Sequence, residues 1–152
     1  MVNARRVYNA SMASLSVLFI CVGNTCRSPM AEAIARELGE GDVAAASAGL
    51  MPFGRIVPTT ARTLKALGYD SLGLASKGLD DVDLSTFDVI VSLLGPTGLS
   101  YLPRTLPAEL QSWSIPDPYG EDDDVYMSVA RELERRIRVL LDDQRTRELS
   151  IF

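Results

Sequence analysis

Residues 16–30 constrain the fold most, because they combine a buried strand, a short loop and a helix start. The run Val17–Ile20 is apolar and rich in β-branched and aromatic residues, which is typical of a parallel strand covered on both faces. Gly23 and Asn24 tolerate unusual backbone angles in the following loop. The dipeptide Ser28-Pro29 then supplies an N-cap and a favoured first helical residue. This strand-loop-helix unit is typical of an α/β sheet.

Strand and helix patterns alternate along the rest of the chain. A chain of 152 residues, 47% hydrophobic and 23% charged, is typical of one globular domain. We therefore predict an α/β fold with a four-stranded parallel sheet, strand order 2-1-3-4, and helices on both faces. The predicted domain spans 15–152, and 1–14 is expected to be a flexible tail. We expect strands at 15–21, 43–47, 87–93 and 111–115, and helices at 28–39, 58–68, 96–102 and 121–145.

The loop at 21–27 has the features of a site for a phosphate-like anion. A helix N-terminus offers unpaired backbone N–H groups and a positive dipole end. Arg27 adds a guanidinium that can grip two oxygens of a phosphoryl group, and this positive field favours the thiolate form of a nearby cysteine. Cys21 is then a candidate nucleophile. A buried structural cysteine, or an arginine paired with Glu32, is the alternative interpretation.

The sequence Cys21-Val-Gly-Asn-Thr-Cys-Arg-Ser-Pro-Met-Ala-Glu-Ala33 resembles the signature of the low-molecular-weight protein tyrosine phosphatases and their arsenate reductase relatives. The resemblance continues at Ser47–Gly49, Phe87–Val91 and Pro116–Gly120, and covers about residues 15 to 145. It implies a two-step reaction through a cysteinyl-phosphate on Cys21, with Arg27 binding the phosphoryl oxygens.

Asp117 is the candidate general acid. The chain contains no histidine, so a carboxylic acid must protonate the leaving group. Asp117 lies between two prolines that restrict its backbone, after the predicted last strand. The resemblance implies that it first protonates the leaving oxygen and then activates water. A plain turn residue is the alternative role. An acid within 122–124 is another candidate, although acidic residues that open a helix more often satisfy its dipole.

The resemblance also implies a set of substrate-binding residues. The aromatic residues Phe53 and Tyr119 would wall the entrance, although Phe53 could equally be a loop residue packed on the core. Cys26 would either protect Cys21 through a reversible disulfide or merely pack. The loop residues that would surround the phosphate are Val22, Gly23, Asn24, Thr25, Cys26 and Ser28.

The predicted function is hydrolysis of phosphotyrosine in proteins or of small aryl phosphates, and three alternatives remain. The stretch after the third strand resembles the arsenate reductase branch. Reductases often carry a redox cysteine at about the position of Leu94, and because this chain has leucine there, an arsenate reductase would have to be coupled to a small thiol. Thr25 is shared with bacterial protein-arginine phosphatases. A non-enzymatic oxyanion-binding module would need only Arg27.

Composition narrows the expected partners. The net charge of −5 argues against nucleic acid, and no apolar run approaches the roughly 20 residues that span a bilayer. Two cysteines within one loop fit a reducing cytoplasm, and the residue types offer no zinc site. We expect no metal or organic cofactor, a phosphorylated protein or aryl phosphate as partner, and a monomer or weak dimer. Arg5 and Arg6 faintly suggest a targeting peptide, but the segment is short and lacks an apolar core, so a start codon upstream of Met12 is the simpler explanation of residues 1–14.

Overall fold

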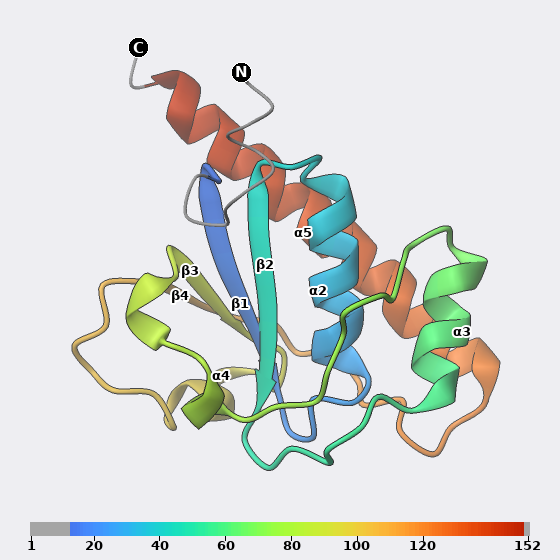
Figure 1. Ribbon diagram of the computed structural model, residues 1–152. Helices are drawn as coiled ribbons and strands as arrows, with labels where there is room; N and C mark the ends of the chain where they lie inside the picture. Colours follow the sequence, from blue (N-terminus) through green and yellow to red (C-terminus); the bar gives the residue numbers. More distant parts are fainter. Residues whose placement is uncertain (1–12, 151–152) are drawn as a thin grey trace.

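The computed structural model describes residues 13–150 and contains one four-stranded sheet with every neighbouring pair of strands parallel (Figure 1). The strand order is β2-β1-β3-β4, as predicted. The expected tail at 1–14 lies almost wholly outside the described residues. The strands are β1 (Leu15–Cys21), β2 (Val43–Gly49), β3 (Val89–Ser92) and β4 (Glu109–Ser112).

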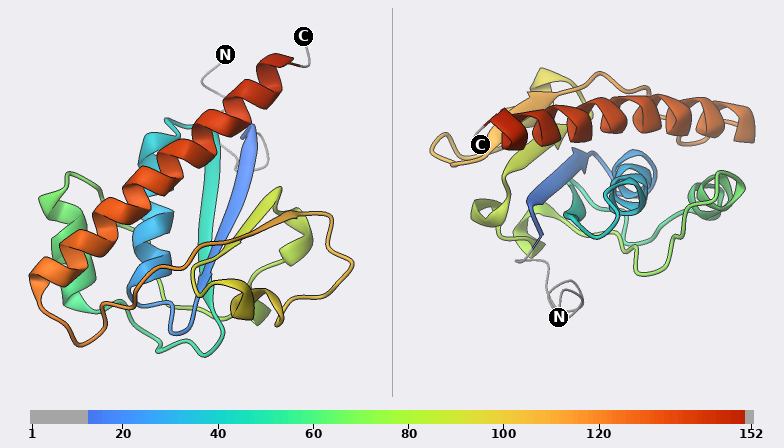
Figure 2. Two further views of the ribbon diagram at one scale, coloured as in Figure 1. Left: turned by 180° about the vertical axis from the view of Figure 1, so that it is seen from behind. Right: turned by 90° about the horizontal axis from the view of Figure 1, so that it is seen from above.

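Helices and 3₁₀ turns cover both faces of the sheet, which confirms the predicted layers (Figure 2). On one face, Val17 and Phe19 of β1 pack with apolar residues of the helices at 27–38 and 123–150. On the other face, Leu18 and Ile20 pack with residues of the 79–87 segment and of 99–108. The helices are α2 (Arg27–Leu38), α3 (Pro58–Ala66), α4 (Pro96–Leu99) and α5 (Asp123–Ser150), and the 3₁₀ turns are η2 (Leu79–Asp81) and η3 (Leu84–Thr86).

The last strand begins and ends earlier than the predicted range of 111–115. Its ladder to β3 starts where the Glu109 N–H donates to the Asp88 carbonyl at 2.9 Å. Beyond Ser112 the regular parallel ladder ends, and Leu94 and Ser114 form an antiparallel bridge. Trp113 and Ile115 are nonetheless buried, and their N–H groups still donate to carbonyls of the 92–93 segment at 2.7 and 3.3 Å.

The start of α2 also differs in detail from the prediction. The helix begins at Arg27 with Cys26 at its N-cap, and no side chain caps it. Ser28, the expected cap, instead contacts Cys21 and Asn24 through its hydroxyl group. The first turn of α2 therefore keeps backbone N–H groups available for another acceptor.

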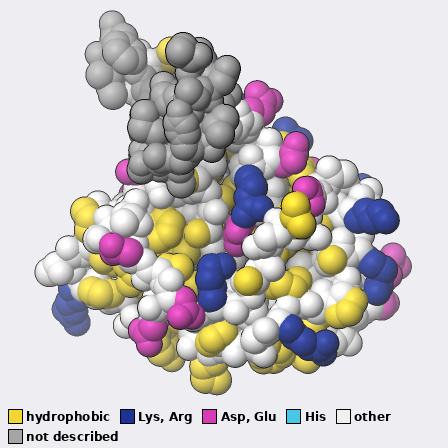
Figure 3. Space-filling view, viewed as in Figure 1, with side chains coloured by type: hydrophobic (Ala, Val, Ile, Leu, Met, Phe, Trp, Pro, Cys, Tyr) yellow, Lys and Arg dark blue, Asp and Glu magenta, His cyan; other side chains and the backbone are white. Residues whose placement is uncertain are grey.

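The described surface mixes charges of both signs. On the face drawn in Figure 3, acidic and basic side chains are interspersed among apolar ones. No helix within residues 13–150 is long and apolar enough to cross a membrane.

Candidate active site

The loop between β1 and α2 has its carbonyl groups engaged and its amides free. The carbonyls of Cys21, Val22 and Gly23 accept hydrogen bonds of 2.9–3.1 Å from amides of the 50–53 segment. In contrast, the N–H groups of residues 22–27 donate to no acceptor in the described chain, 13–150. Free amides next to a helix N-terminus are an arrangement that favours anion binding, so the geometry is compatible with the predicted role of this loop, which stays a prediction.

Asn24 holds this loop in shape from behind. It is fully buried and has a φ of 49°, a left-handed conformation that asparagine tolerates. Its side-chain amide donates to Ser28 Oγ at 2.8 Å and to Ser47 Oγ at 2.9 Å, and its Oδ1 accepts from the Lys77 N–H at 2.7 Å. Both polar atoms of its side chain are therefore used for support.

The approach of β2 to the loop requires glycine at one position. A Cβ on Gly49 would lie 2.7 Å from the Val22 carbonyl oxygen and 2.9 Å from the Asn24 nitrogen. Any larger residue would push the strand and the loop apart. The Ser47–Gly49 motif thus serves two purposes, because its serine supports Asn24 and its glycine permits the contact.

Cys21 ends β1 and is buried at the base of the loop. Its Sγ lies 2.9 Å from Ser28 Oγ. Because Asn24 already donates to Ser28 Oγ, the hydroxyl hydrogen of Ser28 is available to donate to the sulfur. A thiolate can only accept hydrogen bonds, so this geometry suits a thiolate.

Arg27 is fixed by the carboxyl-terminal ends of the sheet. Its side chain is only 8% exposed, and Nη1 donates to the Ile115 carbonyl at 3.0 Å. Nη2 lies 3.6 Å from Asp117 Oδ2. The alternative pairing with Glu32 is absent from the described ion pairs, since Glu32 binds Arg36 instead.

Asp117 lies at the mouth of the same cavity. Its side chain is 54% exposed, and Oδ1 accepts the Tyr119 N–H at 3.1 Å. Two of the alternative acids have other partners, because Asp122 Oδ1 accepts from the Val125 N–H and Asp123 pairs with Arg62. Asp117 lines the loop cavity, whereas none of the acidic residues at 121–124 does.

The cavity itself is small, about 60 Å³. Phe53 and Tyr119 are half-exposed at its entrance and touch edge to face, with ring centroids 5.1 Å apart. Asn24 and Ser28 support the loop from behind, and every other predicted site residue lines the cavity. These are Cys21, Val22, Gly23, Thr25, Cys26, Arg27, Phe53, Asp117 and Tyr119.

The side chains of Thr25 and Cys26 make contacts that the sequence did not indicate. The Thr25 hydroxyl donates to the Arg55 carbonyl at 2.6 Å and accepts from the Val57 N–H at 3.2 Å. Cys26 Sγ lies 3.3 Å from the Tyr126 hydroxyl, and burial raises the pKa of the Cys26 thiol. Both side chains therefore tie the loop to its neighbours.

Three supporting residues were missed as site residues. Ser47 donates to Glu32 Oε1 at 2.6 Å and accepts from Asn24, so it connects α2 to the loop. Tyr126 of α5 contacts Cys26. Glu32 carried a usable signal, because a carboxylate among the apolar residues of a core-facing helix requires a buried partner. Tyr126 had none, since its contact joins positions far apart in the chain.

Comparison with known proteins places this geometry among related enzymes. The family model described as low molecular weight phosphotyrosine protein phosphatase matches residues 16–150. A glutaredoxin arsenate reductase from Synechocystis sp. is 32% identical over 82% of this chain and 95% of its own. The low molecular weight protein-tyrosine-phosphatase YfkJ of Bacillus subtilis is 35% identical over 69% of this chain and 81% of its own.

A solved structure shows the same fold. The low molecular weight protein tyrosine phosphatase from T. tengcongensis superimposes with a TM-score of 0.74 at 30% identity, covering 86% of this chain and 99% of that one. The similar proteins thus include both phosphatases and an arsenate reductase.

Proposed function

Since the chain belongs to the low molecular weight phosphotyrosine protein phosphatase family, we propose that it hydrolyses phosphotyrosine in proteins or small aryl phosphates. The observation that carries this proposal is the position of Asp117. Its Oδ2 lies 3.6 Å from Arg27 Nη2, and both residues line the cavity that contains Cys21. A nucleophile, an anion clamp and an acid therefore meet at one cavity.

In the first step, the Cys21 thiolate attacks phosphorus while the bond to the leaving oxygen breaks. Arg27 and the free amides of 22–27 bind the three non-bridging oxygens, whose charge they stabilise. Asp117, protonated, donates its proton to the leaving phenolate oxygen. The products are the free phenol and a phosphate joined to Cys21 Sγ.

In the second step, water attacks the cysteinyl-phosphate. The Asp117 carboxylate takes a proton from the water as the sulfur–phosphorus bond breaks. Inorganic phosphate leaves and Cys21 returns to the thiolate, with Ser28 positioned to donate to it. The cycle restores the proton on Asp117, so both residues are ready for another turnover.

Arsenate reduction is the second candidate, favoured by the Synechocystis relative. Cys21 would displace hydroxide from arsenate, and an external thiol would then attack the Cys21 sulfur, releasing arsenite and leaving a mixed disulfide. This route uses an external thiol because Leu94 occupies the expected redox position and Cys26 Sγ lies against the Tyr126 hydroxyl at 3.3 Å. The small cavity, about 60 Å³, also suits a small oxyanion.

Phosphoarginine is supported less directly. The Thr25 hydroxyl already has a donor and an acceptor in the 55–57 segment, so it would influence the pocket mainly through its small size. Because a smaller side chain at Thr25 could still change which substrates fit, the test includes phosphoarginine.

The test compares the reduced protein with its Cys21→Ser variant on four substrates. These are p-nitrophenyl phosphate, a phosphotyrosine peptide, a phosphoarginine peptide, and arsenate with glutathione. We expect turnover of the aryl phosphates and its loss in Cys21→Ser, which should still be stabilised by inorganic phosphate in thermal unfolding. Arsenate reduction without phosphate release would reject the phosphatase, and phosphate binding without any turnover would indicate a binding module.

A further inference from the structure

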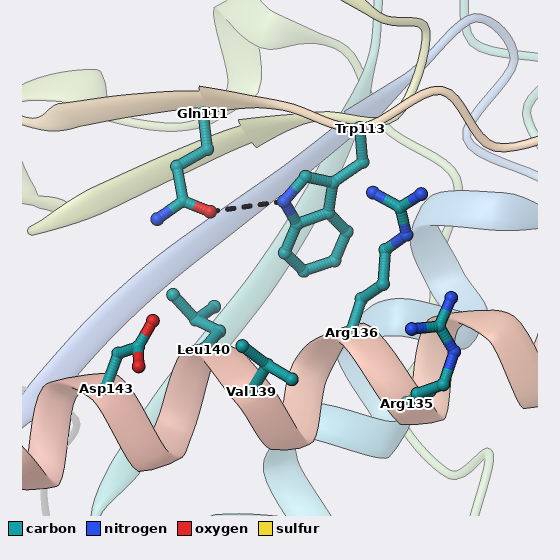
Figure 4. A pocket seen from close by; sticks show the side chains of 7 residues that line it. All are labelled: Gln111, Trp113, Arg135, Arg136, Val139, Leu140 and Asp143. Atoms are coloured by element: carbon teal, nitrogen blue, oxygen red, sulfur yellow. Dashed lines mark hydrogen bonds between the residues drawn. The ribbon is translucent and has the colours of Figure 1, made fainter.

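A second cavity, of about 240 Å³, lies between β4 and α5 (Figure 4). The strand contributes a polar residue, and the residue just after the strand is aromatic. The helix contributes an apolar pair, with two arginines before it and an aspartate after it in the chain. In Figure 4 the Gln111 side chain lies above Leu140, with Asp143 toward one end of the helix and Arg136 toward the other. The lining residues are Gln111, Trp113, Arg135, Arg136, Val139, Leu140 and Asp143.

The strand beside this cavity is an edge with free backbone groups. Glu109 and Trp113 donate their N–H groups to β3-side carbonyls at 2.9 and 2.7 Å. Because backbone direction alternates along a strand, Leu110 and Ser112 direct theirs away from β3. Within residues 13–150 their N–H groups find no acceptor, and both residues are exposed. Such an edge is a template for another strand.

The helix beside the cavity carries an exposed apolar centre with opposite charges at its ends. Val139 is 54% exposed, and Leu140 beside it is buried. Arg136 precedes Val139 by the same number of residues as Asp143 follows Leu140. Arg136 binds Glu132 through Nε at 2.7 Å, which leaves its terminal nitrogens for another carboxylate. A two-fold axis through the centre would bring each arginine opposite the aspartate of the other copy.

We propose that this surface binds a second copy of the chain across a two-fold axis perpendicular to the sheet at Gln111. Leu110 of each copy pairs with Ser112 of the other, so the two sheets form one antiparallel junction. The two α5 helices then run antiparallel on the same face, with Val139 at the centre and an Arg136–Asp143 pair on each side. The interface is isologous and small, as expected of a weak dimer. It uses none of the proposed catalytic residues.

The test is a charge-swap experiment on the full chain, read by sedimentation velocity over a concentration series. Arg136→Glu or Asp143→Arg each creates two like-charge contacts per dimer, and we expect each to weaken dimerisation roughly tenfold or more. The double variant Arg136→Glu/Asp143→Arg restores both pairs in reverse and should recover the association. Arg138→Glu is the matched control, because Arg138 is exposed on α5 outside the cavity lining.

A backbone variant tests the strand junction independently. Ser112→Pro removes an N–H group that makes no bond within the described chain, so an edge strand should tolerate it while losing the pairing. Circular dichroism checks that the variant is folded. A wild type that stays monomeric at every concentration would overturn the proposal. So would a dimer that the single reversals leave unchanged, or one that the double variant does not restore.

Discussion

The two oxygens of Asp117 have different surroundings, and this difference suits an acid that must also act as a base. Oδ1 accepts the Tyr119 N–H, which fixes the carboxyl group at the cavity mouth. Oδ2 lies 3.6 Å from the guanidinium of Arg27. This contact is long enough for a bound phosphate to take the place of Oδ2 as the partner of Arg27. With about half of its side chain exposed, Asp117 can also exchange protons with water.

We expect Asp117→Asn to slow aryl phosphate hydrolysis by about 10²–10⁴, the contribution typical of a general acid. The amide keeps the size of the carboxyl group and can still accept the Tyr119 N–H, but it cannot deliver a proton. Steady-state kcat on a phosphotyrosine peptide measures the effect. Asp124→Asn is the control, because Asp124 is exposed and does not line the cavity. A kcat close to that of the wild type would reduce Asp117 to a turn residue.

At the scale of elements, one serine connects β2, α2 and the loop at 21–27. Ser47 donates to Glu32 of α2 and accepts from Asn24 of the loop. All three side chains are buried, so none can replace a lost partner with bulk water. The shape of the loop therefore depends on the packing of the first helix against the second strand.

We predict that Ser47→Ala lowers the free energy of unfolding by about 1–3 kcal/mol, the cost of leaving buried polar groups unsatisfied. Because Asn24 loses one of its supports, the dissociation constant for inorganic phosphate should also rise. Urea denaturation and phosphate titration measure the two effects. The control is Ser100→Ala, whose exposed hydroxyl bonds only the Thr97 carbonyl. Equal stability of Ser47→Ala and the wild type would show that the connection is not needed.

Across the whole molecule, local signals in the sequence predict more of the structure than long-range contacts do. The succession of strands and helices along the chain and the loop at 21–27 followed from hydrophobic runs and turn residues that lie close together in the chain. The segment 113–115 was mistaken for regular strand because Trp113 and Ile115 alternate with an exposed serine and are buried, and this pattern does not show where the regular ladder ends. Ser28 looked like a cap because it directly precedes Pro29, whereas its hydroxyl contacts Cys21 and Asn24, a role that only the family resemblance indicated.

The candidate site shows the same division. Cys21 and Arg27 were predictable because a single motif contains them, and Asp117 because the chain has no histidine and the acid lies between prolines. Their catalytic roles stay predictions. Tyr126 was not predictable, since its contact with Cys26 depends on how α5 crosses the molecule. Asn24 was predicted as a loop residue, but its bond to the Lys77 backbone depends on a segment that has no regular pattern.

The docking of the 67–69 turn against α5 should make the free energy of unfolding decrease at alkaline pH. The Tyr69 hydroxyl donates to Glu134 of α5, and burial together with this carboxylate raises the pKa of Tyr69 from 10.0 to about 12. The folded protein therefore holds this proton more tightly than the unfolded chain does. The stabilisation is complete below pH 10 and is lost as the pH rises toward 12. We expect a loss of roughly 1–2 kcal/mol from this group, measured by urea unfolding at several pH values.

Tyr69→Phe should be less stable at neutral pH and should lack this part of the alkaline decline. Tyr101→Phe, which changes an exposed tyrosine, should follow the wild type throughout. Identical pH profiles for Tyr69→Phe and the wild type would contradict the assignment to Tyr69.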